Sequence, residues 1–431
     1  MKKYIIILIV IFNFNGLLAD NNVIFFVESA LQNNPKLNAE RENLKAIKQN
    51  KNISRSEFLP SLTISGSQTS IETSNIINQS GNRSADTSRN TETKKISVDQ
   101  KIFQGFQGYN NLKKSRLEFE KAKNEFKQVE QDTILNSVST YYDLIFKSKS
   151  KEFNLANVDL FERQVESDRS RLQKGEISLT DLAQSESSLA GAQAAFIKAD
   201  TEYVSAIAEF ERINRITAPK DLNVNFDVSF IMPQSLKDAL EFSNSNNPNL
   251  AIARINLAIS EKELNVEKAR LSPSASLNYS KTENKDLNAT VDEDEQETVK
   301  ATVTWPIIQG GKNFSSIKKF RHKKEKNALL LEDKENEIKT QTATSWSFFQ
   351  SAESVLASTE AQLKAAEIAN EGITLEYDSG NTRTTLEVIQ SRSLLLEARI
   401  SNAEAKKDFI VSKLRLLSQV GGLDLQAFKT P

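Results

Sequence analysis

The stretch Val299-Lys300-Ala301-Thr302-Val303-Thr304-Trp305-Pro306-Ile307 alternates apolar and polar side chains, and it decides the fold of this chain. Alternation with a period of two predicts a β-strand that has one apolar and one polar face. Gln309-Gly310-Gly311 then breaks the alternation, and the residues that follow have a helical pattern. The same order occurs earlier, where residues 96–102 alternate and Phe103-Gln104-Gly105 precedes another long helix. A short strand therefore leads into a long helix twice.

The chain carries an internal duplication. Landmarks of several kinds recur at a constant spacing within each part of the chain, which indicates a repeated structural unit. The matched landmarks are Pro35 with Pro248, Pro60 with Pro273, Gln104 with Gln309 and Gly175 with Gly380. The spacing changes only inside a polar loop, where insertions are tolerated. The repeated unit is a helix, then two strands, then a long helical hairpin.

The duplication predicts the domain boundaries. The first repeat spans 20–218, a proline-bounded linker spans 219–234, the second repeat spans 235–422, and 423–431 form a C-terminal tail. We expect strands at about 61–69 and 95–104 in the first repeat and at about 274–281 and 298–308 in the second. Each long hairpin is expected to turn at a glycine, Gly175 or Gly380, because glycine adopts the left-handed conformation that commonly ends a helix.

Residues 1–19 have the features of a secretory signal peptide. Lys2 and Lys3 precede a short apolar run, and Ala19 provides a small residue before the cleavage point. We therefore expect an exported protein. This feature alone fits a soluble periplasmic protein equally well.

The two longest predicted helices are far longer than a globular domain requires. Tyr109–Lys174 and Lys312–Glu371 contain neither glycine nor proline. At 1.5 Å per residue, each helix would span roughly 90–100 Å. Apolar residues recur in both at spacings of three and four, which indicates coiled-coil packing.

Composition excludes several classes of function. The net charge of −1 provides no basic surface for nucleic acid. The chain has no cysteine and one histidine, His322, which lies in a basic helical run. No phosphate-binding loop of the G-x-x-x-x-G-K-[ST] type is present. We therefore expect no enzyme, no catalytic residue, no cofactor and no metal site.

The four predicted strands indicate a membrane sheet shared between copies of the chain. Their length is that of strands that cross a bilayer when tilted, and their alternation suits a barrel wall between lipid and water. Four strands cannot close, because spanning barrels begin near eight strands. Two, three or four copies would give eight, twelve or sixteen strands. Small soluble hairpins attached to a coiled coil are the alternative interpretation.

The order of these features resembles the TolC-like outer-membrane efflux protein family over essentially all of the mature chain. The similarity rests on the duplicated Asn-Asn-Pro step before each medium helix, the Leu-Pro-Ser-Leu strand entry, the Gln-Gly turn from strand to helix, and the two tip glycines. The resemblance implies a mainly α-helical protein of duplicated antiparallel hairpins that form an α-barrel. It also implies a homotrimer, in which three copies pool four strands each into one 12-strand β-barrel.

The resemblance also implies a periplasmic gate at the hairpin tips. Glu387 and Gln390 match positions that carry acidic residues around the narrow mouth, and Gln390 departs from the family by being uncharged. Thr180, Asp181, Tyr377 and Arg383 match positions that hold the tips together in the closed state. Arg383 is expected to donate to Asp181 or Thr180, and Tyr377 to Asp181. Two simpler roles remain open: Glu387 as an ordinary acid in a first helical turn, and Thr180 and Asp181 as a helix cap.

We therefore expect an outer-membrane exit duct of a tripartite efflux or type I secretion system in a Gram-negative bacterium, with its helices in the periplasm. The resemblance implies a periplasmic adaptor and an inner-membrane transporter as partners, with outer-membrane lipid around the barrel. The duct would be passive and would open at its helical tips. The alternative is an exported periplasmic scaffold or adaptor without a pore, which accounts for the helices but not for the four strands.

Overall fold

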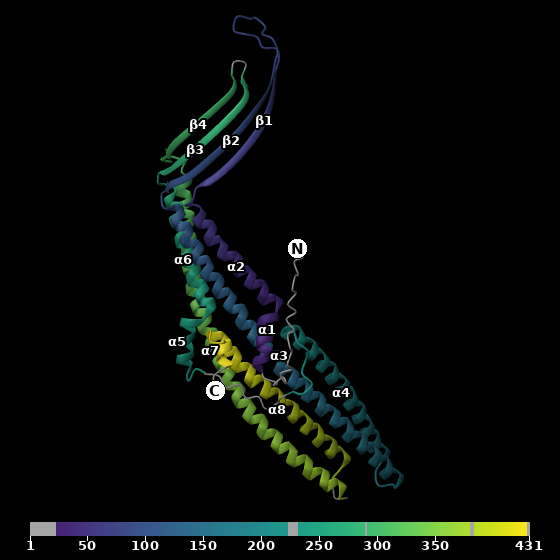
Figure 1. The fold of residues 1–431 in the computed structure, drawn as a ribbon. Coiled ribbons are helices and arrows are strands. Elements are labelled where there is room, and N and C mark those ends of the chain that lie inside the picture. Colours follow the sequence, from purple (N-terminus) through teal and green to yellow (C-terminus); the bar gives the residue numbers. More distant parts are fainter. Residues whose placement is uncertain (1–22, 223–231, 289–290, 380–382, 429–431) are drawn as a thin grey trace, which may run out of the picture. The chain divides into compact units, whose positions relative to one another are not determined.

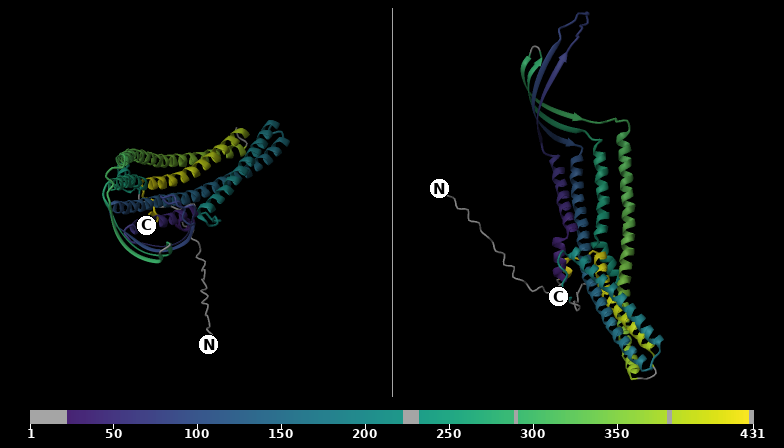
Figure 2. Two further views of the ribbon diagram at one scale, coloured as in Figure 1. Left: turned by 90° about the horizontal axis from the view of Figure 1, so that it is seen from above. Right: turned by 90° about the vertical axis from the view of Figure 1, so that its right-hand side faces the viewer.

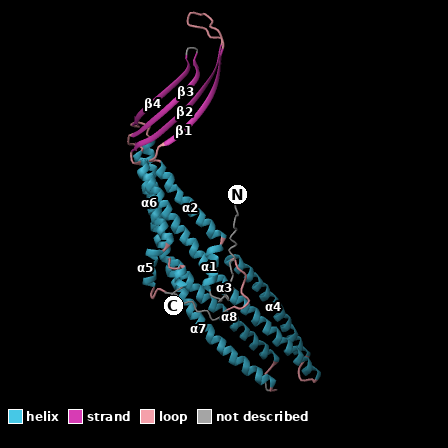
Figure 3. Cartoon of the chain, in the orientation of Figure 1, coloured by secondary structure: helices cyan, strands magenta, loops and turns pink. Residues whose placement is uncertain are grey.

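The computed structural model describes residues 23–222, 232–288, 291–379 and 383–428 (Figure 1). Within these ranges the chain is mainly helical and has a four-stranded antiparallel sheet (Figure 3). The predicted signal peptide, the tip glycine Gly380 and parts of the linker and the tail lie outside the described residues. The predicted fold class, long helices with four strands in each chain, is confirmed.

The element order repeats once, as the duplication predicts. The helices are α1 (Val23–Asn33), α2 (Pro35–Ser56), α3 (Gln107–Gln173), α4 (Leu179–Asn214), α5 (Leu236–Asn246), α6 (Pro248–Ala269), α7 (Lys312–Asp378) and α8 (Thr385–Val420), followed by the short 3₁₀ helix η1 (Leu425–Phe428). The strands are β1 (Ser61–Thr73), β2 (Thr87–Gln104), β3 (Ser274–Asn288) and β4 (Val291–Thr304). The helices α1 and α5, which precede the two Asn-Asn-Pro steps, were not predicted from the sequence.

The residues group into two compact units. The hairpin unit comprises Met1–Ala39, Gln128–Asn247 and Ile338–Pro431, and the sheet unit comprises Glu40–Lys127 and Pro248–Glu337. The long helices α3 and α7 contribute residues to both units. Among the described residues, none of the helices combines the length and the apolarity that a membrane span requires.

The sheet separates apolar from polar side chains by face. Its strands follow the order β1-β2-β3-β4, and Leu62, Val98, Tyr279 and Val299 form one row across all four strands. Paired residues in an antiparallel sheet point to the same face. The adjacent row, Thr63, Ser97, Ser280 and Thr298, is polar and points to the other face. Figure 2 shows that the strands curve along their length.

The apolar face of the sheet is uncovered. Leu62, Ile64, Val299 and Val303 are 66%, 73%, 71% and 74% exposed. Because β1 and β4 are the outer strands, each has an edge that no other described strand of this chain pairs with. A sheet with an exposed apolar face and two open edges aggregates in water. The sheet therefore requires lipid and further strands.

All four strands extend beyond the predicted ranges, toward the polar loops. The extensions of β3 and β4 are held together by charged pairs: Lys281 pairs with Glu295, and Lys285 Nζ lies 3.2 Å from Glu293 Oε1. Cross-strand pairs of opposite charge stabilise a sheet, although Asn, Asp, Glu and Lys have low intrinsic strand propensity. The alternation of apolar residues, on which the strand prediction rests, is absent there.

The strand β4 ends at Thr304, before the predicted end at 308. Pro306 explains the difference, because proline lacks the N–H that a sheet ladder requires. Trp305 follows directly, and its Nε1 donates a hydrogen bond to the Leu271 carbonyl at 3.1 Å. This bond ties the end of β4 to the segment that enters β3.

The hairpin unit has an aromatic core. Phe26 of α1 packs against Tyr141 of α3 and Phe210 of α4, with ring centroids 4.9 Å and 5.3 Å away. Tyr141 and Phe210 are fully buried. Leu414 of α8 belongs to the same cluster. The short helix α1 thus contributes to the core that holds α3, α4 and α8 together.

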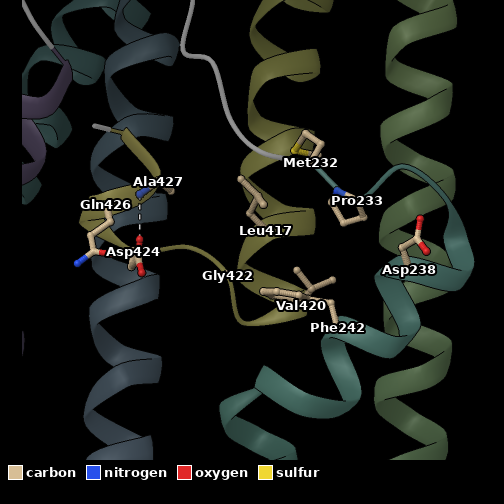
Figure 4. A pocket seen from close by; sticks show the side chains of 10 residues that line it. All are labelled: Met232, Pro233, Asp238, Phe242, Leu417, Val420, Gly422, Asp424, Gln426 and Ala427. Atoms are coloured by element: carbon tan, nitrogen blue, oxygen red, sulfur yellow. Dashed lines mark hydrogen bonds between the residues drawn. The ribbon is translucent and has the colours of Figure 1, made fainter. Parts of the chain in front are cut away.

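A cavity of about 470 Å³ lies where α8 ends (Figure 4). It is lined by Met232, Pro233, Asp238, Phe242, Leu417, Val420, Gly422, Asp424, Gln426 and Ala427. The Ala427 N–H donates to Asp424 Oδ1 at 2.9 Å, which fixes the start of η1. Gly421 ends α8 beside this cavity with φ of 83°, and the Gly421 N–H donates to the Ser418 carbonyl at 3.0 Å.

Gly421 is a position where we expect a side chain to be costly. A Cβ there would overlap the Asn246 carbonyl of α5, and the left-handed backbone penalises any residue other than glycine. We predict that Gly421→Ala lowers the free energy of unfolding by at least about 1–2 kcal/mol, from the backbone penalty alone. Thermal unfolding followed by circular dichroism measures the loss.

Gly191→Ala is the matched control for this substitution. Gly191 lies inside α4, and a Cβ there would have open space around it. Because alanine favours a helix over glycine by about 0.5–1 kcal/mol, this variant should be slightly stabilised. Equal effects of the two substitutions would contradict the proposed role of Gly421.

Candidate functional site

The candidate site is the pair of hairpin tips in the hairpin unit. The α3–α4 tip turns at Gly175, which has φ of 77° and whose N–H donates to the Leu172 carbonyl at 2.9 Å. The α7–α8 tip includes 380–382, which lie outside the described residues. The Gly175 conformation is the left-handed one that ends many helices.

Both return helices begin with a capping box. Ser178 Oγ accepts from the Asp181 N–H at 3.2 Å, and Asp181 Oδ2 accepts from the Ser178 N–H at 2.9 Å. Thr384 and Glu387 make the same reciprocal pair, at 3.3 Å and 2.8 Å. Each box satisfies two N–H groups that would otherwise lack a partner at the start of a helix. The two repeats thus share the same capping arrangement at the start of the return helix.

The capping bonds hold both carboxylates in their charged form. Hydrogen bonds from the Ser178 hydroxyl and backbone lower the pKa of Asp181, and the backbone N–H of Thr384 and the Arg383 guanidinium lower the pKa of Glu387. A lowered pKa means that the contribution to stability is complete above the ordinary value and is lost as pH falls through the lowered value. Both caps are therefore fully formed at neutral pH.

Arg383 forms two ion pairs inside the α7–α8 hairpin. Its Nε donates to Glu376 Oε2 at 2.6 Å and its Nη1 donates to Glu387 Oε1 at 3.0 Å. These two bonds raise the pKa of Arg383. Within one chain, Arg383 thus pairs with Glu376 and Glu387 of its own hairpin, whereas the resemblance implied Asp181 or Thr180 as its partner.

Tyr377 is buried, and its partner also differs from the expected one. Its hydroxyl donates to Asp168 Oδ1 at 3.0 Å, whereas Asp181 is engaged by Ser178. Thr385 Oγ1 lies 3.1 Å from the same hydroxyl and donates to it, because the tyrosine proton is already directed at Asp168. Burial raises the pKa of Tyr377, so the hydroxyl keeps its proton.

Asp168, which accepts the Tyr377 bond, was not predicted from the sequence. Its carboxylate is fully buried and accepts from Gln164 Nε2 at 3.0 Å and from Ser185 Oγ at 2.5 Å, in addition to Tyr377. The sequence feature that indicates Asp168 is its position within a row of apolar residues on α3. Phe161 and Val165 are buried on one face of α3, and Asp168 continues their spacing of three and four. An acid in an apolar stripe indicates a buried, hydrogen-bonded charge.

The remaining predicted residues lie on the surface of the tips. Thr180 is exposed in the first turn of α4, and Gln390 is exposed on α8. Glu387 is in its capping box and paired with Arg383, so the simpler role considered for it is present. Asp181 likewise serves as a cap. The gate roles of these residues stay predictions.

Duplicated long helical hairpins, joined to a sheet with an uncovered apolar face, define the class of outer-membrane export channels. The family described as outer membrane efflux protein matches residues 26–213 and 240–422, and the chain belongs to this family. This confirms the predicted resemblance, the outer-membrane location with periplasmic helices, and the role as a channel for efflux or secretion. It gives no support to the alternative of a scaffold without a pore.

Known proteins are similar to this chain over most of their length. The outer membrane efflux protein BepC of Brucella suis is 24% identical over 393 residues, which cover 91% of this chain and 83% of BepC. The alkaline protease secretion protein AprF of Pseudomonas aeruginosa is 21% identical over 406 residues, covering 92% and 83%. The solved CmeC outer membrane channel of Campylobacter jejuni has a TM-score of 0.81 at 14% identity, covering 94% and 88%. This structural similarity shows a shared fold.

Proposed function

We propose that the chain is a passive exit duct that opens at its periplasmic tips. The observation that carries the proposal is the uncovered apolar face of a sheet with two open edges, attached to long helical hairpins. Such a sheet fits lipid on one face and a water-filled lumen on the other. The names of BepC and AprF connect relatives to efflux and to protease secretion, and either cargo class suits a conduit of this design.

A homotrimer supplies the missing strands and covers exposed apolar side chains. Ile197 and Val204 of α4 are 64% and 57% exposed, and Phe348 and Val355 of α7 are 67% and 49% exposed. Each pair is spaced by seven residues and therefore lies on one helix face. Neighbouring copies would bury these rows against each other. The family resemblance supports three copies and a shared barrel of twelve strands.

Energy for transport would come from partner proteins. The sequence has no nucleotide-binding loop and no catalytic constellation, and the family and fold are those of channel proteins. A periplasmic adaptor and an inner-membrane transporter are the partners that the family supports. The hairpin tips, at Gly175 and at Gly380, are the surface at which they would dock.

The gate would combine bonds within a chain and between chains. Tyr377 joins the two hairpins of one chain. Arg383 uses two of its five N–H donors on its own hairpin, so its other donors are available for Asp181 or Thr180 of the next copy. Glu387 and Gln390 would lie at the mouth. With Gln390 neutral, the mouth would attract cations less strongly than a double acidic ring.

Membrane fractionation separates the channel from the scaffold. We predict that the protein sediments with the outer membrane, requires detergent for extraction, and migrates differently in gels before and after heating, because a closed barrel resists denaturation. Recovery in the soluble periplasmic fraction, with migration unchanged by heating, would support the scaffold and contradict the channel.

Removing the gate bonds should open the pore. We predict that Tyr377→Phe combined with Arg383→Ser raises the open probability in planar bilayers. A hydrogen bond to a buried charge contributes about 1.5–3 kcal/mol, which corresponds to a change of at least about tenfold in the closed–open equilibrium.

The control for the gate variant removes the same two side-chain groups, a tyrosine hydroxyl and a guanidinium, at positions away from the tips. Tyr203→Phe with Arg399→Ser removes a tyrosine hydroxyl from α4 and a guanidinium from α8, where Arg399 pairs with Glu367 at 3.6 Å. This control should conduct like the wild type. The gate assignment is wrong if the tip variant and the control behave alike.

A further inference from the structure

We propose that Asp168 is the positioning residue that locks the tips, through one buried carboxylate that accepts hydrogen bonds from α3, α4 and α7 and that α8 reaches through the Tyr377 hydroxyl. Asp168 and Gln164 lie on α3, Ser185 on α4, Tyr377 on α7 and Thr385 on α8. The proposal rests on the exit duct proposed above and identifies what keeps its periplasmic end closed.

Both oxygens of the carboxylate are engaged. Oδ1 accepts from Gln164 Nε2 and from the Tyr377 hydroxyl, each at 3.0 Å, and Oδ2 accepts from Ser185 Oγ at 2.5 Å. Gln164 Nε2 also lies 3.3 Å from the Tyr377 oxygen. One charge thus connects the α3–α4 hairpin internally, through Ser185, and connects it to the α7–α8 hairpin, through Tyr377.

The donors to this carboxylate are all neutral. Among the described residues, no lysine or arginine forms an ion pair with Asp168. Arg392 is close enough to interact with Asp168 electrostatically but makes no ion pair with it. A buried carboxylate without a counter-ion in contact depends mainly on its hydrogen bonds for stability. Loss of the Tyr377 hydroxyl would leave Oδ1 with Gln164 alone, in a site that excludes water. The closed arrangement therefore requires both hairpins to be in place at once.

Two arginines lie close to Asp168 and Tyr377 without donating a hydrogen bond to the Asp168 carboxylate. The Arg171 guanidinium lies 4.6 Å from the centroid of the Tyr377 ring, which keeps the ring oriented toward α3. Arg392 Nη1 donates to the Leu160 carbonyl at 3.3 Å and so joins α8 directly to α3. Burial lowers the pKa of Arg392. These contacts position the hairpins, and Asp168 supplies the acceptor that joins them.

Asp181, the acceptor that the resemblance implied for Tyr377, caps the start of α4 in this chain. Its carboxylate bonds the Ser178 hydroxyl at 2.7 Å and the Ser178 N–H at 2.9 Å, on an exposed turn. Asp168 lies on α3, the other helix of the same hairpin, and is completely buried. The bond inside one chain that closes the tips is thus made by Asp168, and Asp181 is left for its cap and for contacts between copies.

The test measures open probability in planar bilayers for Asp168→Ala, Tyr377→Phe and the double variant. Each single variant should raise the open probability by at least about tenfold, the effect of losing a hydrogen bond to a buried charge. The double variant should be no more open than the more open single variant, because both substitutions remove the same bond. General destabilisation would instead give independent effects that multiply.

Two further acids serve as controls. Asp159→Ala removes an exposed acid from the same helix and should conduct like the wild type. Asp181→Ala should leave the coupling between Asp168 and Tyr377 intact. The proposal is overturned if Asp168→Ala conducts like Asp159→Ala, or if Tyr377 is coupled to Asp181 and not to Asp168.

Assembly of each variant is checked by its heat-modifiable migration. If Asp168→Ala does not assemble, Asp168→Asn and Ser185→Ala replace it, because they keep the size of the site or remove one donor only. Both must open more often than the wild type, and wild-type behaviour in both overturns the proposal. Failure of the exit duct itself is distinct, since the wild type would then form no channels at all.

Discussion

The unmet hydrogen-bonding capacity at the edges of the sheet is the constraint on which the rest of the structure depends. The strands β1 and β4 lie at the edges, and one face of the sheet presents apolar side chains that the protein does not cover. In lipid, backbone N–H and C=O groups need partners within protein, so an open sheet must be completed by other copies. The shared barrel and the oligomer proposed above both follow from this requirement.

The features predicted from the sequence are those set by local chemistry. Alternation around Val299–Val303 predicts β4, and the lack of glycine and proline between 109 and 174 predicts α3. The strand ends are missed because Lys281–Glu295 and similar charged pairs replace the apolar alternation there. Their stability comes from a partner on the neighbouring strand, which no local window contains.

The tips show the same division between local and distant contacts. The capping boxes of Ser178 with Asp181 and of Thr384 with Glu387 follow from sequence spacing. The resemblance pointed to Asp181 as the acceptor for Tyr377, whereas within this chain the acceptor is Asp168. The choice between two nearby acids depends on how two separate hairpins pack, and burial of Asp168 at a core position of α3 decides it. A carboxylate inside an apolar stripe is the sequence feature that would have pointed to it.

The most direct test of the central claim is the mass of the detergent-extracted protein by native mass spectrometry. We predict a complex of three chains, which supplies twelve strands and leaves no open edge. A single chain, stable in water without detergent, would contradict the requirement for a shared barrel. Two or four chains would preserve that requirement but contradict the trimer.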